Sequence, residues 1–334
     1  METKIITVSN QPDSSADYTT VSEALCHAKG LNTSVLLKIY PGIYKEKITL
    51  DTPYISIKGM GNSPAETVLT YDDYANDIME DGSKRGTFRT YSMLIDAHDI
   101  TLENLTIENS AGLGKYKGQA IALYADGDRI VLNNCRLIGN QDTLFTGPLP
   151  PKELQPGGFI GPKQFSERIN GRHYYKNCFI QGNIDYVFGS ATAFFDECVF
   201  HSVLASETPE EREIHGYVTA ASTPEGQQYG YVMNKCRFTS NCPKGSMYLG
   251  RPWRDYAQTI LIDCEMDECI HPLGWNDWKK ENARANAFYG ELNSTGTGAS
   301  VNRDSFVKIL DDSYRANFRK EKVLGGEDNW NPEF

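Results

Sequence analysis

The sequence predicts an all-β protein whose strands stack in successive parallel coils, a parallel β-helix or solenoid. A short pattern, reading apolar, polar, polar, Cys or Leu, any residue, apolar, returns along the middle of the chain. Gly and Asn turns separate the copies at irregular intervals, and few stretches have helical periodicity. Such short units bury an apolar face only by stacking on one another. The copies are residues 102–107, 132–137, 175–180, 195–200, 233–238 and 261–266, the last with a shortened polar pair.

Aligning the copies places one small apolar side chain of each coil at an equivalent interior position. These residues are Leu105, Cys135, Cys178, Cys198, Cys236 and Cys264. Buried cysteine behaves as a small hydrophobe, so we interpret this ladder as structural rather than reactive. Adjacent coils lie about 4.8 Å apart, which is within the Cα range of a disulfide. Cys178 and Cys198 are therefore expected to be close enough to bridge in an oxidising compartment.

Each end of the repeat carries a candidate helix. Residues 20–23 have the T-x-x-E form of a capping box, and an apolar face follows. That face is Val21, Ala24, Leu25 and Ala28. It predicts a helix that closes the N-terminal end of the solenoid. Near the C-terminus a second helix is predicted, at the end or along the outside, from the helical spacing of Phe306, Ile309, Leu310, Tyr314 and Phe318.

Composition narrows the class of protein and its partners. The chain has 334 residues, 40% hydrophobic and 23% charged, and we expect one soluble domain over residues 1–334. The formal charge of -11 disfavours nucleic acid as a partner, and no apolar run is long enough to cross a membrane. An acidic polymer is a suitable partner only if positive charge gathers at the site. The sequence contains no CxxC or HExxH segment, so it does not predict a metal site.

The N-terminus bears on the compartment. Residues 1–8 lack the hydrophobic stretch of a signal peptide, and several cysteines are expected to be free thiols. These features slightly favour a cytoplasmic protein. The alternative is a secreted protein whose leader has been removed.

Residues 146–171 interrupt the repeat. This segment contains five prolines and several glycines and has no clear period, which predicts a long loop. Long loops in compact domains are usually functional or mobile. This one begins shortly after the first of two candidate catalytic residues.

Two aspartates share one phase of the repeat. Asp142 lies seven residues after Cys135, and Asp185 lies seven residues after Cys178. Equal phase on successive coils would hold the two carboxylates about 5 Å apart, so the pKa of one must rise. A protonated and an ionised carboxyl group can then coexist at one pH. Taken singly, either aspartate is better interpreted as a turn-capping residue; the matched phase and the apolar or aromatic flanks favour a site.

Four ordered segments resemble the signature motifs of the pectin methylesterase family. They are residues 119–123 (QAIAL), 141–145 (QDTLF), 184–189 (IDYVFG) and 249–253 (LGRPW). Residues 42–46 (GIYKE), 272–278 (PLGWNDW) and 288–299 (FYGELNSTGTGA) add support. The resemblance covers about residues 18–299 and implies a right-handed β-helix that uses no metal or organic cofactor. The loop after QDTLF is longer than the family pattern.

The resemblance also implies residue roles, which spacing alone does not assign. Asp185 would be the nucleophile, and Asp142 the acid that protonates the leaving group as it departs as methanol and then activates water. The side-chain amides of Gln119 and Gln141 would donate to the oxyanion, and Arg251 would keep Asp185 ionised. Four aromatic residues would contact the substrate: Trp253, Phe188, Phe145 and Tyr186. The alternatives are an interior amide for Gln119, a surface ion pair for Arg251 and simple packing for Trp253.

The implied substrate is methyl-esterified homogalacturonan or short methylated oligogalacturonides. The features of the N-terminus and the free thiols slightly favour a cytoplasmic enzyme acting on imported fragments. We expect a monomer. A pectate lyase or polygalacturonase on the same fold is the first competing interpretation, and a polysaccharide-binding solenoid without activity is the second. A lyase would need a calcium site and a basic residue at the reacting carbon. A binding protein would need aromatic residues but not the pair of aspartates with Arg251 and two glutamines.

Overall fold

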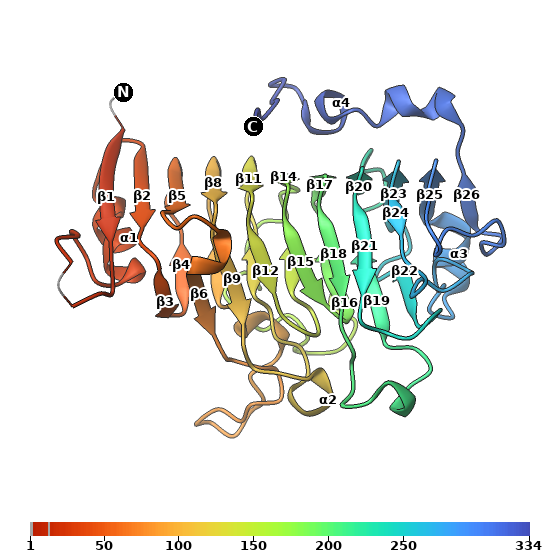
Figure 1. Cartoon of the computed structure of the whole chain (residues 1–334), viewed down its shortest axis with the longest axis horizontal. Helices are drawn as coiled ribbons and strands as arrows, with labels where there is room; N and C mark the ends of the chain where they lie inside the picture. Colours follow the sequence, from red (N-terminus) through yellow and green to blue (C-terminus); the bar gives the residue numbers. More distant parts are fainter. Residues whose placement is uncertain (1–2, 13) are drawn as a thin grey trace.

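Successive coils of the chain stack into one β-helix, and three parallel sheets form its walls (Figure 1). The computed structural model describes residues 3–12 and 14–334. Sheet A contains β1 (Lys4–Val8), β2 (Val35–Ile39), β5 (Ile55–Gly59), β8 (Ile100–Glu103), β11 (Ile130–Asn133), β14 (Arg172–Lys176), β17 (Thr192–Asp196), β20 (Tyr231–Asn234), β23 (Gln258–Ile262), β25 (Phe288–Leu292) and β26 (Val307–Ile309). Every strand pairing described within the three sheets is parallel, as the stacked-coil prediction requires.

The other two sheets complete each coil. Sheet B contains β3 (Gly42–Lys45), β6 (Thr67–Tyr71), β9 (Thr106–Asn109), β12 (Arg136–Ile138), β15 (Phe179–Gly182), β18 (Val199–Ser202), β21 (Arg237–Ser240) and β24 (Glu265–Met266). Sheet C contains β4 (Ile48–Leu50), β7 (Met93–Ile95), β10 (Leu123–Ala125), β13 (Leu144–Thr146), β16 (Ile184–Gly189), β19 (Gly216–Ala221) and β22 (Met247–Gly250). The main apolar core fills the space that the three sheets enclose.

The predicted ladder of cysteines is confirmed by the strand register. Arg136 pairs with Thr106 and with Phe179, so the preceding residues, Leu105, Cys135 and Cys178, stack on one another. The register of sheet B continues the ladder to Cys198, Cys236 and Cys264. A left-handed corner residue precedes each position, as with φ 51° at Asn134. This conformation explains why Asn, Asp and other polar residues recur there.

The ladder thiols are buried hydrogen-bond donors. The Cys178 thiol donates to the carbonyl of Leu132 at 3.5 Å, and that of Cys198 donates to the carbonyl of Tyr175 at 3.3 Å. Burial raises the pKa of the Cys135 thiol to about 12. We therefore expect the buried thiols of the ladder to react slowly. Cys178 and Cys198 are both unbridged in the structure, and their pairing under oxidising conditions stays a prediction.

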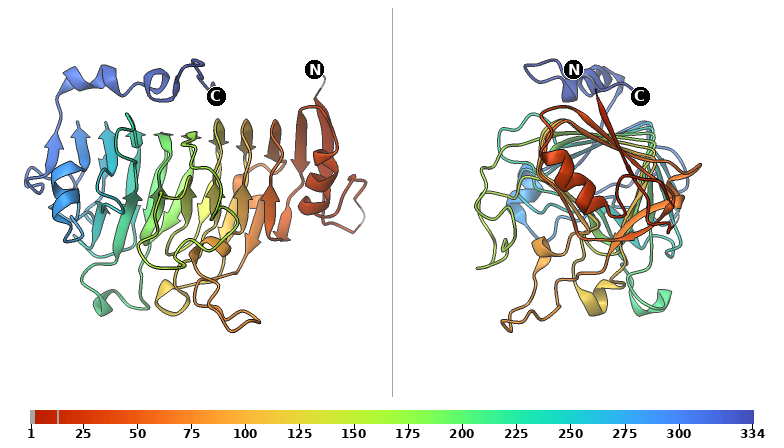
Figure 2. Two further views of the ribbon diagram at one scale, coloured as in Figure 1. Left: turned by 180° about the vertical axis from the view of Figure 1, so that it is seen from behind. Right: turned by 90° about the vertical axis from the view of Figure 1, so that its left-hand side faces the viewer.

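The predicted N-terminal helix is α1 (Val21–Lys29), and it closes one end of the solenoid (Figure 2). The hydroxyl of Thr20 accepts a hydrogen bond from the backbone N–H of Glu23, as a capping box requires. The Glu46 carboxylate, from the GIYKE segment, accepts from the N–H groups of Val21 and Ser22, each at 2.9 Å. Glu46 therefore stabilises the positive end of the helix and docks it on the coils.

The prediction for the C-terminal helix is right about its existence but wrong about its residues. The segment with helical spacing forms β26 and a 3₁₀ helix, η4 (Asp312–Asn317), while the helix itself is α4 (Lys320–Leu324). Ile309 is 66% exposed, so the apolar spacing does not describe a buried helical face. Val323 and Leu324 of α4 pack instead on an apolar stripe outside sheet A. The other short helices are α2 (Gly114–Lys117), α3 (Glu281–Asn286), η1 (Pro64–Glu66), η2 (Thr87–Arg89) and η3 (Pro209–Glu211).

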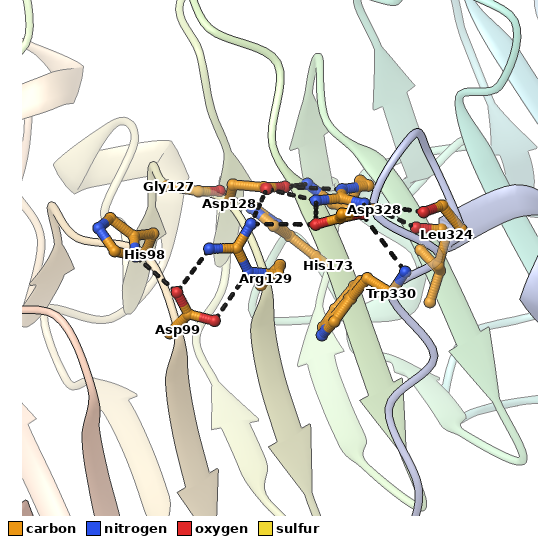
Figure 3. Close-up of polar contacts among 11 residues, drawn as sticks. His98, Asp99, Gly127, Asp128, Arg129, His173, Leu324, Asp328 and Trp330 are labelled. Carbon is orange, nitrogen blue, oxygen red and sulfur yellow. Dashed lines mark hydrogen bonds and ion pairs between the residues drawn. The ribbon is translucent and has the colours of Figure 1, made fainter. Parts of the chain in front are cut away.

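The segment after α4 is held on sheet A by charged side chains (Figure 3). Asp328 lies between two arginines: Arg172, which also pairs with Asp128, and Arg129, which also pairs with Asp99. The C-terminal segment therefore runs back along the outside of the solenoid, over sheet A. Among the described residues, no helix is long and apolar enough to cross a membrane.

Candidate active site

The two aspartates lie at the same place on successive coils of sheet C. Leu144 pairs with Val187 in the parallel register, which makes Asp142 and Asp185 equivalent. The backbone N–H of Asp142 donates to the carbonyl of Ile184 at 3.0 Å. Both aspartates have left-handed backbones, with φ 65° and 52°, a conformation that is rare outside glycine and often found at functional sites. The predicted matching phase is confirmed.

Asp185 is held by a two-pronged ion pair. Arg251, which follows β22, donates from Nε to Oδ1 at 2.8 Å and from Nη2 to Oδ2 at 2.7 Å. Its guanidinium plane lies between two aromatic rings, 3.9 Å from the ring centroid of Tyr217 and 3.7 Å from that of Trp278. Stacking fixes the guanidinium, so both oxygens of Asp185 are fixed as well.

The environments of the two carboxyl groups differ. Burial, and secondarily the Asp185 charge, raise the pKa of Asp142 well above its ordinary range. Burial also raises the pKa of Asp185, but the charge and hydrogen bonds of Arg251 oppose that rise. In the described part of the chain the Asp142 carboxyl has no hydrogen bond or ion pair of its own. The pair is therefore polarised towards a protonated Asp142 and an ionised Asp185.

Two side-chain amides face the same cavity. Gln119 precedes β10 and Gln141 precedes β13, and both line a cavity of about 350 Å³ that also contains the two aspartates and Arg251. Within the described residues neither amide group has a hydrogen-bonding partner, so both are free to donate to a ligand. Gly114 lies against Gln141, where an added Cβ would come within 2.6 Å of its Oε1. A side chain at residue 114 would displace the amide.

Aromatic residues form the apolar wall, but not all of those predicted. Trp253 and Phe188 line the cavity as expected. Phe145 does not, because it is fully buried beneath other rings, with its centroid 5.1 Å from that of Phe88 and 4.9 Å from that of Phe188. It supports the wall without reaching the substrate.

Tyr186 is also wrongly predicted as a substrate contact. Its side chain lies in the main core, fully buried, with its hydroxyl 3.1 Å from that of Ser202. Because side chains alternate along a strand, the residue after Asp185 faces the interior. A register irregularity between Ile184 and Val187 then returns Phe188 to the outer face.

Several residues at the site were missed by sequence reasoning. Trp278 is the last residue of the PLGWNDW segment, so that motif could have identified it. Phe159 comes from the loop after β13, and Phe88 from η2; neither stands in a periodic segment. Tyr217 stacks on Arg251 from the start of β19 and carries no motif.

Positive charge gathers at the site despite the acidic composition. Arg251 and Arg254 line the cavity, and Lys280 donates to the backbone carbonyls of Pro252 and Trp253. Because the chain has a net charge of -11, an acidic polymer can bind only where positive charge gathers, and this cluster supplies that charge.

The chain matches the family model described as Pectinesterase over residues 6–148 and 168–327. Pectinesterase 31 of Arabidopsis thaliana is 33% identical over 304 residues, covering 89% of this chain and 84% of the relative. Pectinesterase QRT1 of the same plant is 32% identical, covering 85% and 67%. The unmatched residues 149–167 fall within the loop between β13 and β14, so this loop is outside the family pattern, as the sequence indicated.

Solved structures share the whole fold. Pectin methylesterase PemA from Erwinia chrysanthemi superposes with a TM-score of 0.79 at 27% identity, covering 98% of each chain. Pectin methylesterase from carrot gives 0.77 at 26% identity, covering 98% and 97%. These are right-handed parallel β-helices, and the expected handedness is thereby confirmed.

The preference for the cytoplasm is wrong. The relatives are secreted cell-wall pectinesterases of plants and microbes, and the secreted alternative agrees with them. The free thiols misled the interpretation because the ladder cysteines are buried and hydrogen-bonded within the coils. Thiols enclosed in this way do not indicate a compartment. From its match to the family model and its close fold likeness, the chain belongs to the pectinesterase family.

Proposed function

We propose that the chain hydrolyses methyl esters of galacturonate in pectin, releasing methanol and free carboxylate, with Asp185 as nucleophile. The observation that carries the proposal is the asymmetric pair of carboxyl groups. Asp185 has both oxygens bound by Arg251, and Asp142, one coil away, pairs with no cation in the part of the chain that the structure describes. One cavity thus holds a nucleophile and an acid, beside two free amide donors.

In the first step, Asp185 attacks the ester carbonyl carbon and the carbonyl oxygen becomes an oxyanion. The amides of Gln119 and Gln141 donate to that oxygen, which stabilises the tetrahedral intermediate. When the intermediate collapses, the carbon–oxygen bond to the methoxy group breaks. Asp142 gives its proton to the departing oxygen, so methanol leaves and an acyl-enzyme anhydride remains on Asp185.

In the second step, the deprotonated Asp142 takes a proton from water. The resulting hydroxide attacks the acyl carbon and the bond to Asp185 breaks, so that galacturonic acid leaves and gives its proton to solvent. Asp142 is then protonated and Asp185 ionised, as at the start. Each residue returns to its initial state without another reactant.

The substrate is a methylated galacturonan, either pectin or a shorter oligogalacturonide. A solved pectin methylesterase that is 27% identical to this chain is in complex with a hexasaccharide. The rings of Trp253 and Phe188 offer apolar surface for sugar rings, and the cations match carboxylates already released. We propose that the protein acts as a monomer, without nucleic acid or membrane as a partner.

The function is tested by three product assays on one methylated homogalacturonan. Hydrolysis of the ester releases methanol and leaves the chain length unchanged. A lyase would instead produce unsaturated ends, and a glycoside hydrolase would produce new reducing ends. Methanol release without either of the other products supports the proposal, and its absence from wild-type protein contradicts it.

Arg251→Ala is expected to move the acid limb of the pH–rate profile upwards by about 1 to 3 pH units. Removing the guanidinium takes away what opposes the burial of Asp185, so its pKa rises and ionisation needs a higher pH. Arg251→Lys should restore part of the shift, because lysine keeps the charge but lacks the planar fork. Arg237→Ala, exposed on sheet B, is the control with the same loss of charge. An unshifted acid limb in Arg251→Ala contradicts the role of Arg251.

The loop between β13 and β14 forms one wall of the cavity. Leu154, Gln155, Gly158 and Phe159 line it. The loop is fastened on both sides: Arg254 donates to the carbonyl of Lys152 at 2.8 Å, and Lys163 pairs with Asp96. This wall lies outside the family model, so it is the part of the cavity most specific to this chain.

Shortening residues 146–171 should change the preference for oligomer length more than it changes folding, because a Pro- and Gly-rich loop adds little to the stacked coils. Phe159→Ala should change the preference in the same direction by a smaller amount. Phe165→Ala is the matched control, since that side chain is 93% exposed and does not line the cavity. The measurement is methanol release from a size series of methylated oligogalacturonides, with Tm as the check on folding. An unaltered preference in the shortened chain contradicts the role of the loop.

A further inference from the structure

Lys280 is a half-buried cation beside the site, and it has no carboxylate partner among the described residues. Its ammonium group donates to two consecutive backbone carbonyls, that of Pro252 at 2.8 Å and that of Trp253 at 3.2 Å. It also lies 4.2 Å from the ring centroid of Trp278. The contacts described for the ammonium group are therefore with residues that line the cavity or directly adjoin them.

A strained turn places this lysine. Trp278 and Lys279 both have φ 55°, which is unfavourable for two successive residues with side chains. Side-chain oxygens hold the turn: Asn276 accepts from the N–H of Trp278, and Asp277 accepts from that of Lys279, each at 2.8 Å. The turn brings the Trp278 ring against Arg251 and the Lys280 ammonium against the backbone after Arg251.

The carbonyl of Trp253 receives a second cationic donor. Arg254 donates to it from Nη1 at 3.0 Å and stacks on the indole ring, with its guanidinium carbon 4.9 Å from the centroid. Lys280 and Arg254, which belong to two different segments, thus both donate to the carbonyl of Trp253. Because Trp253 directly follows Arg251 and Pro252, these hydrogen bonds restrain both Arg251, which pairs with Asp185, and the aromatic wall.

Placing three cations together is unfavourable by itself. Burial, and secondarily the charge of Arg254, lower the pKa of Lys280 to about 8. Arg251 acts in the same direction, while Asp255 and Asp185 act in the opposite one. The charge of Lys280 in turn favours the ionised form of Asp185. A partly desolvated charge retained without an ion pair indicates a functional constraint.

We propose that Lys280 is a positioning residue of the esterase reaction, which fixes the segment from Arg251 to Trp253 and places a second positive charge near Asp185. The proposal rests on the proposed function for its effect on rate. It adds to the role of Arg251 because Lys280 acts on Asp185 without touching it.

Three variants separate position, charge and net charge. Lys280→Met removes the donors and the charge, and Lys280→Arg keeps the charge on a differently shaped group. Lys279→Met is the matched control, since it deletes the same charge from the adjacent, exposed residue of the same turn. Methanol release is measured against pH for all of them, with Tm as the check on folding. Tryptophan emission is followed from pH 6 to 9.5 in the same proteins.

Lys280→Met should lower kcat/KM about tenfold and move the acid limb up by roughly half a pH unit or more, as expected for one nearby charge. Lys280→Arg should keep the acid limb in place, and Lys279→Met should match wild type. Wild-type emission should change with a midpoint near pH 8, and this step should be missing from both Lys280 variants.

An acid limb and a kcat/KM for Lys280→Met equal to those of Lys279→Met would overturn the proposal, as would an emission step that persists in Lys280→Met. Should Lys280→Met fail to fold, Lys280→Arg still tests the proposal. An emission step near pH 8 that is retained in Lys280→Arg would contradict the assignment of the titrating group to Lys280. Wild-type protein that releases no methanol would instead overturn the proposed function. The emission step would still test whether the Lys280 ammonium is bound to the carbonyl of Trp253.

Discussion

Asp185→Asn is expected to lower methanol release by at least about 10³-fold, the loss found when an essential member of a catalytic unit is removed. An amide cannot attack the ester carbonyl, and among the described residues Arg251 pairs with no other carboxylate. The variant should also be less stable, because Arg251 stays half-enclosed between two rings without its partner. Methanol release and Tm measure the two effects.

Asp263→Asn is the matched control for this variant. Asp263 has the same left-handed backbone, with φ 51°, and is likewise bound by both arms of an arginine, Arg315. It lies at a corner between sheets A and B, away from the cavity. We expect it to retain the wild-type rate while losing some stability. A comparable loss of rate in both variants would show that backbone strain or stability, rather than the nucleophile, sets the rate.

Asp142→Asn is expected to cause a similar loss of rate, at least about 10³-fold, with the opposite effect on stability. The amide cannot protonate the departing methoxy oxygen or activate water, so both steps slow. The raised pKa of Asp142 means that the folded state opposes its ionisation. That cost grows as pH rises above the pKa of the unfolded chain, and asparagine removes it. Asp142→Asn should therefore be at least as stable as wild type near neutral pH, whereas a lower Tm would contradict the assigned environment.

The parts of the fold that sequence predicts are those repeated along the chain. The ladder and the matched phase of Asp142 and Asp185 follow from one register, and every coil repeats that register. The N-terminal helix was predicted because its cap and its apolar face lie within one short segment. The C-terminal helix was misplaced because α4 has only two buried apolar residues, fewer than a periodic pattern requires.

The sequence predicted those site residues that stand in signature motifs, but not where each side chain lies. Phe145 and Tyr186 both stand inside signature segments, yet one supports other rings and the other faces the core. A motif records which residues are present and not how far each reaches towards the cavity. Phe159 and Lys280 act from a loop and a turn whose positions depend on tertiary contacts with Trp253. No local pattern could have placed them.

The most direct test of the account is methanol release against pH by wild type, Asp142→Asn and Asp185→Asn on one methylated homogalacturonan. We expect a bell-shaped profile for wild type, since activity needs an ionised Asp185 and a protonated Asp142 at the same pH, and the two limbs belong to the coupled pair. Both variants should lie at least about 10³-fold below the optimum at every pH. A rate close to wild type from either variant, with its fold intact, would contradict the assignment of the two aspartates.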